Sequence, residues 1–245
     1  MAFFATETDL CLPDDLEQTD GSEVCRLVDL GQRAYPEAMK IQSRVVSRRK
    51  LDHIPDCLLL VEHPHTITIG RAGKTSNLLV SEDILRQRGV ALYATDRGGD
   101  ITYHGPGQLV AFPILDLKRQ QRDIGCYLRR LEQCVMDTLT DFGIQGQRVA
   151  GATGVWIGTR KIAAIGVRIS QWVTSHGLAL NVNTDLDYFR LIIPCGLSSR
   201  GVTSLVQVLG RQVNMQQVKE RLGVHFGQVF SRRMQVSLKS DEFQD

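Results

Sequence analysis

The chain has 245 residues, of which 42% are hydrophobic and 23% charged, and its formal net charge is +2 at pH 7. This composition predicts one ordinary globular domain, or a domain with a small appendage. No window approaches the roughly 18 consecutive apolar residues of a membrane span, and the N-terminus lacks the basic and apolar regions of a secretory signal. Both classes are therefore excluded, and we expect a cytoplasmic protein without a membrane partner.

The charges are unevenly distributed along the chain. Residues 1–25 hold seven acidic residues and no basic ones, which leaves 29 basic and 20 acidic residues, a net charge of +9, for the rest. A body of this charge attracts an acidic partner, either a protein or a nucleic acid. We predict an acidic, flexible N-terminal extension over 1–23, a single domain over 24–235 and a C-terminal tail over 236–245.

Strand-like and helical patterns alternate from residue 24 onward. Residues 36–49 carry Ala38, Ile41 and Val45 on one stripe, which is typical of an amphipathic helix. The first half also predicts, in chain order, a strand over 24–31, two strands over 57–63 and 66–70 joined by a tight turn at Pro64, a short helix over 81–89 capped by Ser81, and strands over 90–96 and 107–114.

The second half begins with a long helix from Asp123. Its apolar face is predicted to carry Ile124, Leu128, Leu131, Val135, Leu139 and Phe142. A hairpin over 154–158 and 161–169, a strand over 176–182 and a helix over 213–230 follow. Neighbouring strands this close together pair antiparallel in most cases. The predicted fold class is α+β, with a mixed, largely antiparallel sheet flanked by helices.

Two glycine- and proline-flanked motifs are candidates for chemistry. RGGDITYHGPGQ, residues 97–108, lies between two predicted strands, and it matches neither a phosphate loop nor the GxGxxG pattern. Ligand binding and turn formation both remain open for it. In IIPCGL, Cys195 lies between Pro194 and Gly196, a turn that could hold the thiol out of the core, although burial as a small apolar filler is the ordinary role of a lone cysteine.

Metal and disulfide sites are not predicted. His63 and His65 have the spacing of a metal pair, but no third ligand accompanies them. The cysteines are scattered without a CxxC pair, which favours six thiols over a zinc site or a disulfide framework. They are Cys11, Cys25, Cys57, Cys126, Cys134 and Cys195.

At this point the motifs become recognisable as a set. RGGDITYHGPGQLVAFPI, GATGVWIG, KIAAIGVRIS, HGLALNV and IIPCGL occur in the order found in octanoyltransferases, which the chain resembles from about Val24 to about Thr203. Two positions depart from the family pattern, Phe112 in place of the usual tyrosine and Ser175 before His176. The resemblance implies the catalytic-domain fold of biotin and lipoate protein ligases, which is class II synthetase-like.

The resemblance also implies the reacting groups. The family's nucleophilic cysteine falls on Cys195 and its partner lysine on Lys161. A free thiol is only a few per cent thiolate at neutral pH, and a cationic neighbour raises that fraction. A lysine with a depressed pKa could instead act as the base that removes the thiol proton. Both roles of Lys161 stay open at this stage.

The implied reaction is a two-step acyl transfer. Octanoyl-acyl carrier protein would donate its acyl group to Cys195, and a lysine of a lipoyl domain, in 2-oxoacid dehydrogenase complexes or the glycine cleavage H protein, would accept it. No cofactor, metal, ATP or nucleic acid takes part. The residues implied in substrate binding are Arg97, Gly98, Gly99, Asp100, Ile101, Thr102, Tyr103, His104, Ala164, Ile165, Gly166, Gly177, Leu178 and Ala179.

Three other functions compete with this reading. An ATP-dependent lipoate or biotin ligase of the same fold would need no cysteine. A cysteine hydrolase would pair Cys195 with His104 or His176 and release free acid. A noncatalytic binding protein would use its basic surface, and its affinity would fall steeply with salt. In a transferase, the arginines at 48, 49, 129 and 130 would instead steer the acidic carrier protein.

Overall fold

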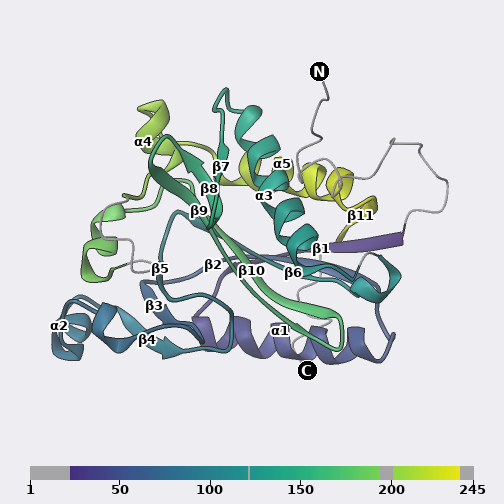
Figure 1. The fold of residues 1–245 in the computed structure, drawn as a ribbon, viewed down its shortest axis with the longest axis horizontal. Helices are drawn as coiled ribbons and strands as arrows, with labels where there is room; N and C mark the ends of the chain where they lie inside the picture. Colours follow the sequence, from purple (N-terminus) through teal and green to yellow (C-terminus); the bar gives the residue numbers. More distant parts are fainter. Residues whose placement is uncertain (1–22, 121, 194–200, 238–245) are drawn as a thin grey trace, which may run out of the picture.

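The computed structural model describes residues 23–120, 122–193 and 201–237, which contain two sheets with helices packed around them (Figure 1). The larger sheet has eight strands in the order β11-β1-β2-β6-β10-β9-β8-β7. Strand β1 runs parallel to both of its neighbours, and every other pair is antiparallel. The predicted mixed, largely antiparallel sheet is therefore confirmed. The strands are β1 (Glu23–Gln32), β2 (Asp56–Glu62), β6 (Gln108–Ile114), β7 (Gln147–Val149), β8 (Ala152–Ile157), β9 (Arg160–Ser170), β10 (Val173–Asn181) and β11 (Arg232–Ser237).

A second, three-stranded sheet has the order β4-β3-β5, with β3 (Thr66–Ile69), β4 (Ala91–Ala94) and β5 (Ile101–His104). The tight turn after β2 therefore carries the chain from one sheet to the other, and β2 and β3 do not pair. The sequence did not predict β5, because its four residues lie inside the glycine-rich motif. Strand β5 pairs antiparallel with β3, and this pairing holds the motif next to the large sheet.

Helices cover both faces of the large sheet (Figure 1). Helix α1 (Tyr35–Lys50) packs on one face, where Ala38 and Val45 are fully buried against Val28 and Leu59. Helices α3 (Ile124–Thr140) and α5 (Met215–Val229) cover the other face. Each fully buried aliphatic side chain stabilises the fold by about 1.5–3 kcal/mol. The shorter helices are α2 (Glu82–Gln87) and α4 (Leu205–Leu209), with 3-10 turns at Thr75–Asn77, Leu117–Arg119 and Leu186–Leu191.

Helix α3 begins where the sequence predicts, because the Asp123 side chain accepts a hydrogen bond from the Cys126 N–H at 3.0 Å. Its predicted apolar stripe is buried in the middle, at Leu131 and Leu139, but not at the start. Ile124 is 48% exposed, and Leu128 faces a cavity rather than the core. The first turns of α3 therefore lie at the rim of a cavity.

Four of the described cysteines are buried, and they fall into two kinds. Cys25, Cys57 and Cys134 are free thiols with no exposed surface, and burial raises the pKa of Cys57 to about 12. Such thiols are unreactive fillers. Cys126 is disulfide-bonded, so the expectation of six thiols is wrong at this position.

Among the described residues, none of the helices combines the length and apolar character required to span a bilayer.

Candidate active site

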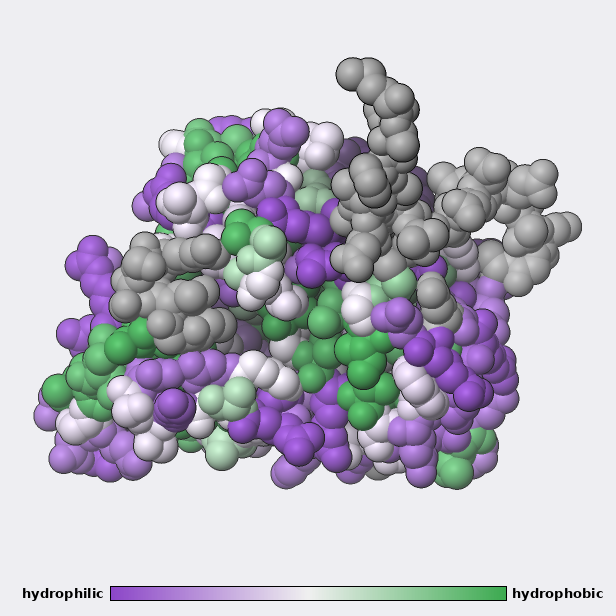
Figure 2. Space-filling view, in the orientation of Figure 1, coloured by the Kyte–Doolittle hydropathy of each residue, from purple (hydrophilic) through white to green (hydrophobic). Residues whose placement is uncertain are grey.

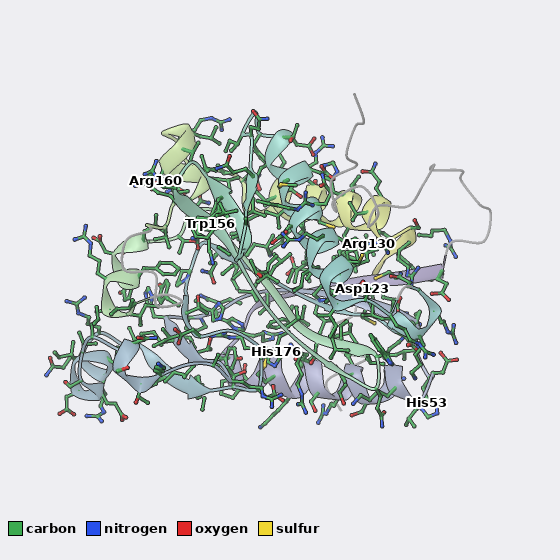
Figure 3. The ribbon with its side chains drawn as sticks, in the orientation of Figure 1. His53, Asp123, Arg130, Trp156, Arg160 and His176 are labelled. Carbon is green, nitrogen blue, oxygen red and sulfur yellow. The ribbon has the colours of Figure 1, made fainter. Side chains whose placement is uncertain are left out.

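A cavity of 460 Å³ opens between β9 and β10, the glycine-rich motif, the first turns of α3 and the turn before β8. Figure 2 shows apolar residues gathered in the middle of this face, over β9, β10 and the start of α3. In Figure 3, Trp156 lies toward the β8 end of this region and His176 toward α1. The predicted site residues on its wall are Arg97, Gly98, Gly99, Asp100, Ile101, Thr102, His104, Lys161, Ala164, Ile165, Gly166, Gly177, Leu178 and Ala179.

One predicted residue of the described part lies away from this wall. Tyr103 points to the opposite face of β5, where its hydroxyl lies 2.7 Å from His65 Nδ1 and its ring stacks on Tyr188. Cys195 lies outside the described residues. Sequence reasoning in turn missed Tyr35 and Leu128, which line the cavity but belong to none of the motifs, and Thr153, which lies in the GATGVWIG motif but was not assigned to the site. Only the fold brings these three residues to the site.

Two cross-strand pairs of small residues, Ala164–Ala179 and Gly166–Gly177, form part of the cavity wall. A Cβ atom on Gly166 would lie 2.9 Å from the Gly98 carbonyl oxygen, and one on Gly177 would lie 2.1 Å from the Ala111 carbonyl oxygen. Close backbone approach therefore dictates the two glycines.

The start of the glycine-rich motif is held by its own polar groups. The Arg97 guanidinium is buried and donates to the Thr68 carbonyl oxygen at 2.8 Å and to Thr68 Oγ1 at 2.9 Å. The Gly98 N–H donates to the Val167 carbonyl oxygen at 2.9 Å. The Asp100 carboxylate accepts from the Asn77 side chain at 2.6 Å. These bonds fix the shape of the loop against β9.

His104 is the centre of a buried hydrogen-bond network. Its Nδ1 lies 2.8 Å from Gln108 Oε1, which accepts the ring N–H, and its Nε2 accepts from the Thr68 hydroxyl at 3.3 Å. Gln108 then donates to Asn181 Oδ1 at 2.9 Å, and Asn181 donates to the Thr203 carbonyl oxygen at 3.0 Å. Burial lowers the pKa of His104 to about 3, so the ring is neutral. A neutral ring with both nitrogens bonded orients its neighbours and is a poor proton donor.

Lys161 lies near the start of β9 and is partly buried at the cavity. Its Nζ donates to the Thr153 carbonyl oxygen at 3.1 Å and lies 4.7 Å from the centroid of the Trp156 ring. Its backbone N–H donates to the Gly201 carbonyl oxygen, and its carbonyl oxygen accepts from the Thr203 N–H, both at 2.9 Å. The strand that carries Lys161 is thus paired with the chain that follows the IIPCGL motif.

The far end of the cavity is bounded by Tyr35 and His176. The His176 backbone is left-handed, at φ +55°, and the residue is 5% exposed. Its ring Nε2 lies 2.7 Å from Asp96 Oδ1, and its backbone N–H donates to Gln42 Oε1 at 3.3 Å. Burial lowers the pKa of His176 despite the Asp96 carboxylate, which acts in the opposite direction. Tyr35 and His176 also line a second cavity of 590 Å³ along α1.

The arginines expected to steer a partner differ in exposure. Arg49 is 2% exposed and forms ion pairs with Asp56 at 2.7 Å and Asp52 at 2.8 Å. A residue buried in this way cannot contact a partner, so the expectation for Arg49 is wrong. Arg48 is exposed, whereas Arg129 and Arg130 are partly buried on α3.

Comparison with known proteins assigns the chain to a family. Residues 34–227 match the family model "Lipoyl protein ligase A/B catalytic domain". The chain is 53% identical to the octanoyltransferase of Solibacter usitatus, over 86% of this chain and 94% of that protein, and 47% identical to that of Flavobacterium psychrophilum, over 85% and 97%.

A solved structure of lipoate-protein ligase A bound with ATP superposes with a TM-score of 0.74 over 89% of this chain and 91% of that one. The two sequences are 18% identical, so this likeness concerns the fold alone. It confirms the fold expected from the motifs. Together with the identities above, it places the chain among the octanoyltransferases of the lipoyl protein ligase A/B catalytic-domain family.

Proposed function

We propose that this octanoyltransferase moves the octanoyl group of octanoyl-acyl carrier protein to a lysine of a lipoyl domain through a thioester on Cys195. The observation that carries the proposal is the pairing of Lys161 with Gly201 and Thr203 at the cavity. Gly201 follows Cys195 by six positions. Ile193 precedes Cys195 by two positions, and its N–H donates to the Asn77 carbonyl oxygen at 2.8 Å. The chain on both sides of Cys195 is thus anchored near the cavity.

The cavity suits a saturated acyl chain. Its described wall combines small pairs, Ala164–Ala179 and Gly166–Gly177, with apolar side chains such as Leu178 and Val110. Burying about seven methylenes at about 0.8 kcal/mol each would contribute roughly 5–6 kcal/mol to binding. We assign the cavity-lining residues of the glycine-rich motif, β9 and β10 to acyl binding. Tyr103, which points away from the cavity, is assigned to holding β5 in place.

The first step forms the bond between Cys195 Sγ and the octanoyl carbonyl carbon, and it breaks the bond from that carbon to the carrier sulfur. The carrier leaves as a thiolate and takes up a proton. In the second step the acceptor lysine amine attacks the same carbon, Cys195 leaves as a thiolate, and the amine loses a proton as the amide forms. Exchange between thioesters is nearly even in energy and amide formation is downhill, so no ATP is needed.

Lys161 is assigned as the cation that stabilises the Cys195 thiolate. A carbonyl oxygen accepts hydrogen bonds from an ammonium group and thereby favours the charged form, and the Thr153 carbonyl oxygen does this at 3.1 Å. The Trp156 ring, 4.7 Å from Nζ, adds a cation–π contact. His104, neutral and bonded through both nitrogens, is assigned an orienting role. These assignments argue against a hydrolase in which His104 activates the thiol.

The acyl donor is an acidic protein, and the net charge of +9 beyond residue 25 would accelerate its encounter with the enzyme. Arg48, Arg129 and Arg130 remain candidates for this steering, and Arg49 is removed from the set. The proposal keeps the cytoplasmic location expected from the sequence, where donor and acceptor proteins would meet.

Intact-mass spectrometry tests the proposal. Wild type and Cys195→Ser are incubated with octanoyl-acyl carrier protein, with and without a lipoyl domain. Wild type is expected to gain one octanoyl group and to lose it to the lipoyl domain without ATP, whereas Cys195→Ser gains none. Transfer that needs ATP and survives Cys195→Ser would instead assign an adenylating ligase, and free octanoic acid without an acceptor would assign a hydrolase.

A further inference from the structure

Glu132 is a carboxylate with no exposed surface, on α3 where that helix contacts strand β8. Its Oε2 accepts from Arg129 Nη1 at 2.6 Å and from Arg148 Nε at 3.1 Å. Its Oε1 accepts from the Gly154 N–H at 2.9 Å. A buried carboxylate is costly unless charged and polar partners surround it. Two arginines neutralise Glu132, and one of its oxygens is left for the backbone beside the cavity.

The Gly154 N–H and the Thr153 carbonyl belong to the same peptide group. Glu132 binds the N–H end of that group, and the Lys161 ammonium binds the carbonyl end at 3.1 Å. One peptide plane therefore lies between the carboxylate and the ammonium. The backbone at Gly154 has φ +122°, and a Cβ there would lie 2.5 Å from the Ala163 carbonyl oxygen. Only glycine allows the peptide to take this orientation.

The arrangement has two physical effects on Lys161. The hydrogen bond from the N–H to the carboxylate fixes the plane of the peptide, which aims the carbonyl oxygen at Nζ. Hydrogen bonds in series also polarise one another, so the carboxylate makes that oxygen a stronger acceptor for the ammonium. Burial strengthens the hydrogen bond at Glu132, since water does not screen it there.

We propose that Glu132 is a positioning residue of the transferase, which holds the Lys161 ammonium at the cavity through the Thr153–Gly154 peptide. Glu132 touches neither substrate nor the reacting atoms. The inference rests on the proposed function, because it assigns Glu132 a role only if Lys161 stabilises the Cys195 thiolate. It adds a residue from outside all the recognisable motifs.

The chain offers a matched control in Asp56, whose side chain is 1% exposed. Asp56 also lies between two arginines, with Arg49 Nε at 2.7 Å and Arg232 Nε at 2.9 Å, and it too accepts a backbone N–H, that of Asp116 at 3.0 Å. Asp56 does not line the cavity that Lys161 lines. Asp56→Asn therefore reproduces the loss of a buried carboxylate without touching the peptide beside Lys161.

The experiment follows alkylation of Cys195 by iodoacetamide at pH 7, with each cysteine read separately by peptide mass spectrometry. The rate reports the thiolate fraction and needs no catalytic turnover. Glu132→Gln is expected to slow alkylation of Cys195 about tenfold, the equivalent of one unit in the thiol pKa, and to lower kcat with KM for the carrier unchanged. Cys25, Cys57 and Cys134 stay protected while the protein is folded, since all three are buried.

A double-variant cycle separates positioning from general damage. In a Lys161→Met background, Glu132→Gln is expected to cause no further slowing, because its effect passes through Lys161. In the Asp56→Asn variant, Cys195 is expected to be alkylated at the wild-type rate. The positioning role is overturned if Glu132→Gln slows the alkylation of Cys195 equally in both backgrounds. It is also overturned if Asp56→Asn slows this alkylation as much as Glu132→Gln does.

Two further outcomes keep the inference apart from the proposed function. If Lys161→Met itself leaves the rate unchanged, the pairing of Cys195 with Lys161 fails. If Lys161→Met slows alkylation and Glu132→Gln does not, only the role of Glu132 fails. Should Glu132→Gln expose the buried cysteines, Glu132→Asp replaces it. The shorter side chain keeps a negative charge between the arginines but withdraws from the Gly154 N–H. Glu132→Asp is therefore expected to slow the alkylation of Cys195 as well.

Discussion

The two sides of the cavity differ in how their polar groups are used. On the side of the glycine-rich motif, Arg97, Asp100 and His104 are bonded to neighbouring residues of the same protein. On the opposite side, the Lys161 ammonium is presented by a carbonyl oxygen and an aromatic ring. The first side therefore shapes the cavity, and we propose that the second supplies charge for chemistry. Substitutions on the two sides should fail in different ways.

The largest effect is expected on the lysine side. Lys161→Met removes the cation and should slow single-turnover octanoyl transfer by about 10²–10³-fold, the range for loss of one electrostatic stabiliser of a reacting group. Its fold should survive, because the backbone bonds to Gly201 and Thr203 remain. Lys50→Met is the control, since Lys50 Nζ binds Ser170 Oγ at the far hairpin. A wild-type rate of octanoyl transfer in Lys161→Met would show that the lysine side of the cavity does not supply charge for the reaction.

The loop side should respond through shape. Gly166→Ala introduces a Cβ 2.9 Å from the Gly98 carbonyl oxygen and 3.3 Å from Arg97 Cδ, so the loop must move. We expect a loss of about 1–3 kcal/mol in the free energy of unfolding and a rise in KM for the acyl donor. Urea unfolding and steady-state kinetics measure the two effects. A variant with lower kcat but unchanged KM and stability would place Gly166 in the chemistry instead.

The sequence predicted the inner strands of the large sheet, the large helices and the order of the motifs, because these depend on periodicity and on short local patterns, but it did not predict the edge strands β7 and β11. It did not predict β5, whose four residues are flanked by turn residues, or the separation of β2 and β3 into two sheets. Glu132 and Leu128 were also beyond reach. On α3, Glu132 carries a charge at a buried position, whereas a charged helix residue ordinarily faces the solvent. Leu128 is an apolar residue at the cavity, whereas its place in the apolar stripe predicts the core. Only tertiary packing decides between these environments.

His104 should affect stability rather than rate-limiting proton transfer. Its folded pKa of about 3 lies below that of an unfolded histidine, about 6.5, so the unfolded chain binds the extra proton between these values. Stability is then fully present above pH 6.5 and falls by about 1.4 kcal/mol for each pH unit below it. His104→Gln should flatten this slope between pH 5 and 6.5 in urea unfolding. His53→Gln, at an exposed position, should keep it, and an unchanged slope in His104→Gln would show that the ring is protonated when folded.

The smallest effect is expected where the two sides meet at the far end of the cavity. His176 lies between the cavity of 460 Å³ and the neighbouring one of 590 Å³, and its left-handed backbone suits glycine without strain. His176→Gly should therefore keep the fold and open a passage for longer chains, while Asp96, 52% exposed, is left in contact with water. Each extra methylene that gains a buried place contributes about 0.8 kcal/mol, so even partial entry should raise the ratio of dodecanoyl to octanoyl transfer several-fold. Competition between the two acyl carrier proteins, read by mass spectrometry of the acceptor, measures this ratio. An unchanged ratio would mean that the acyl chain ends before it reaches His176, and that chain length is set by the small pairs of β9 and β10.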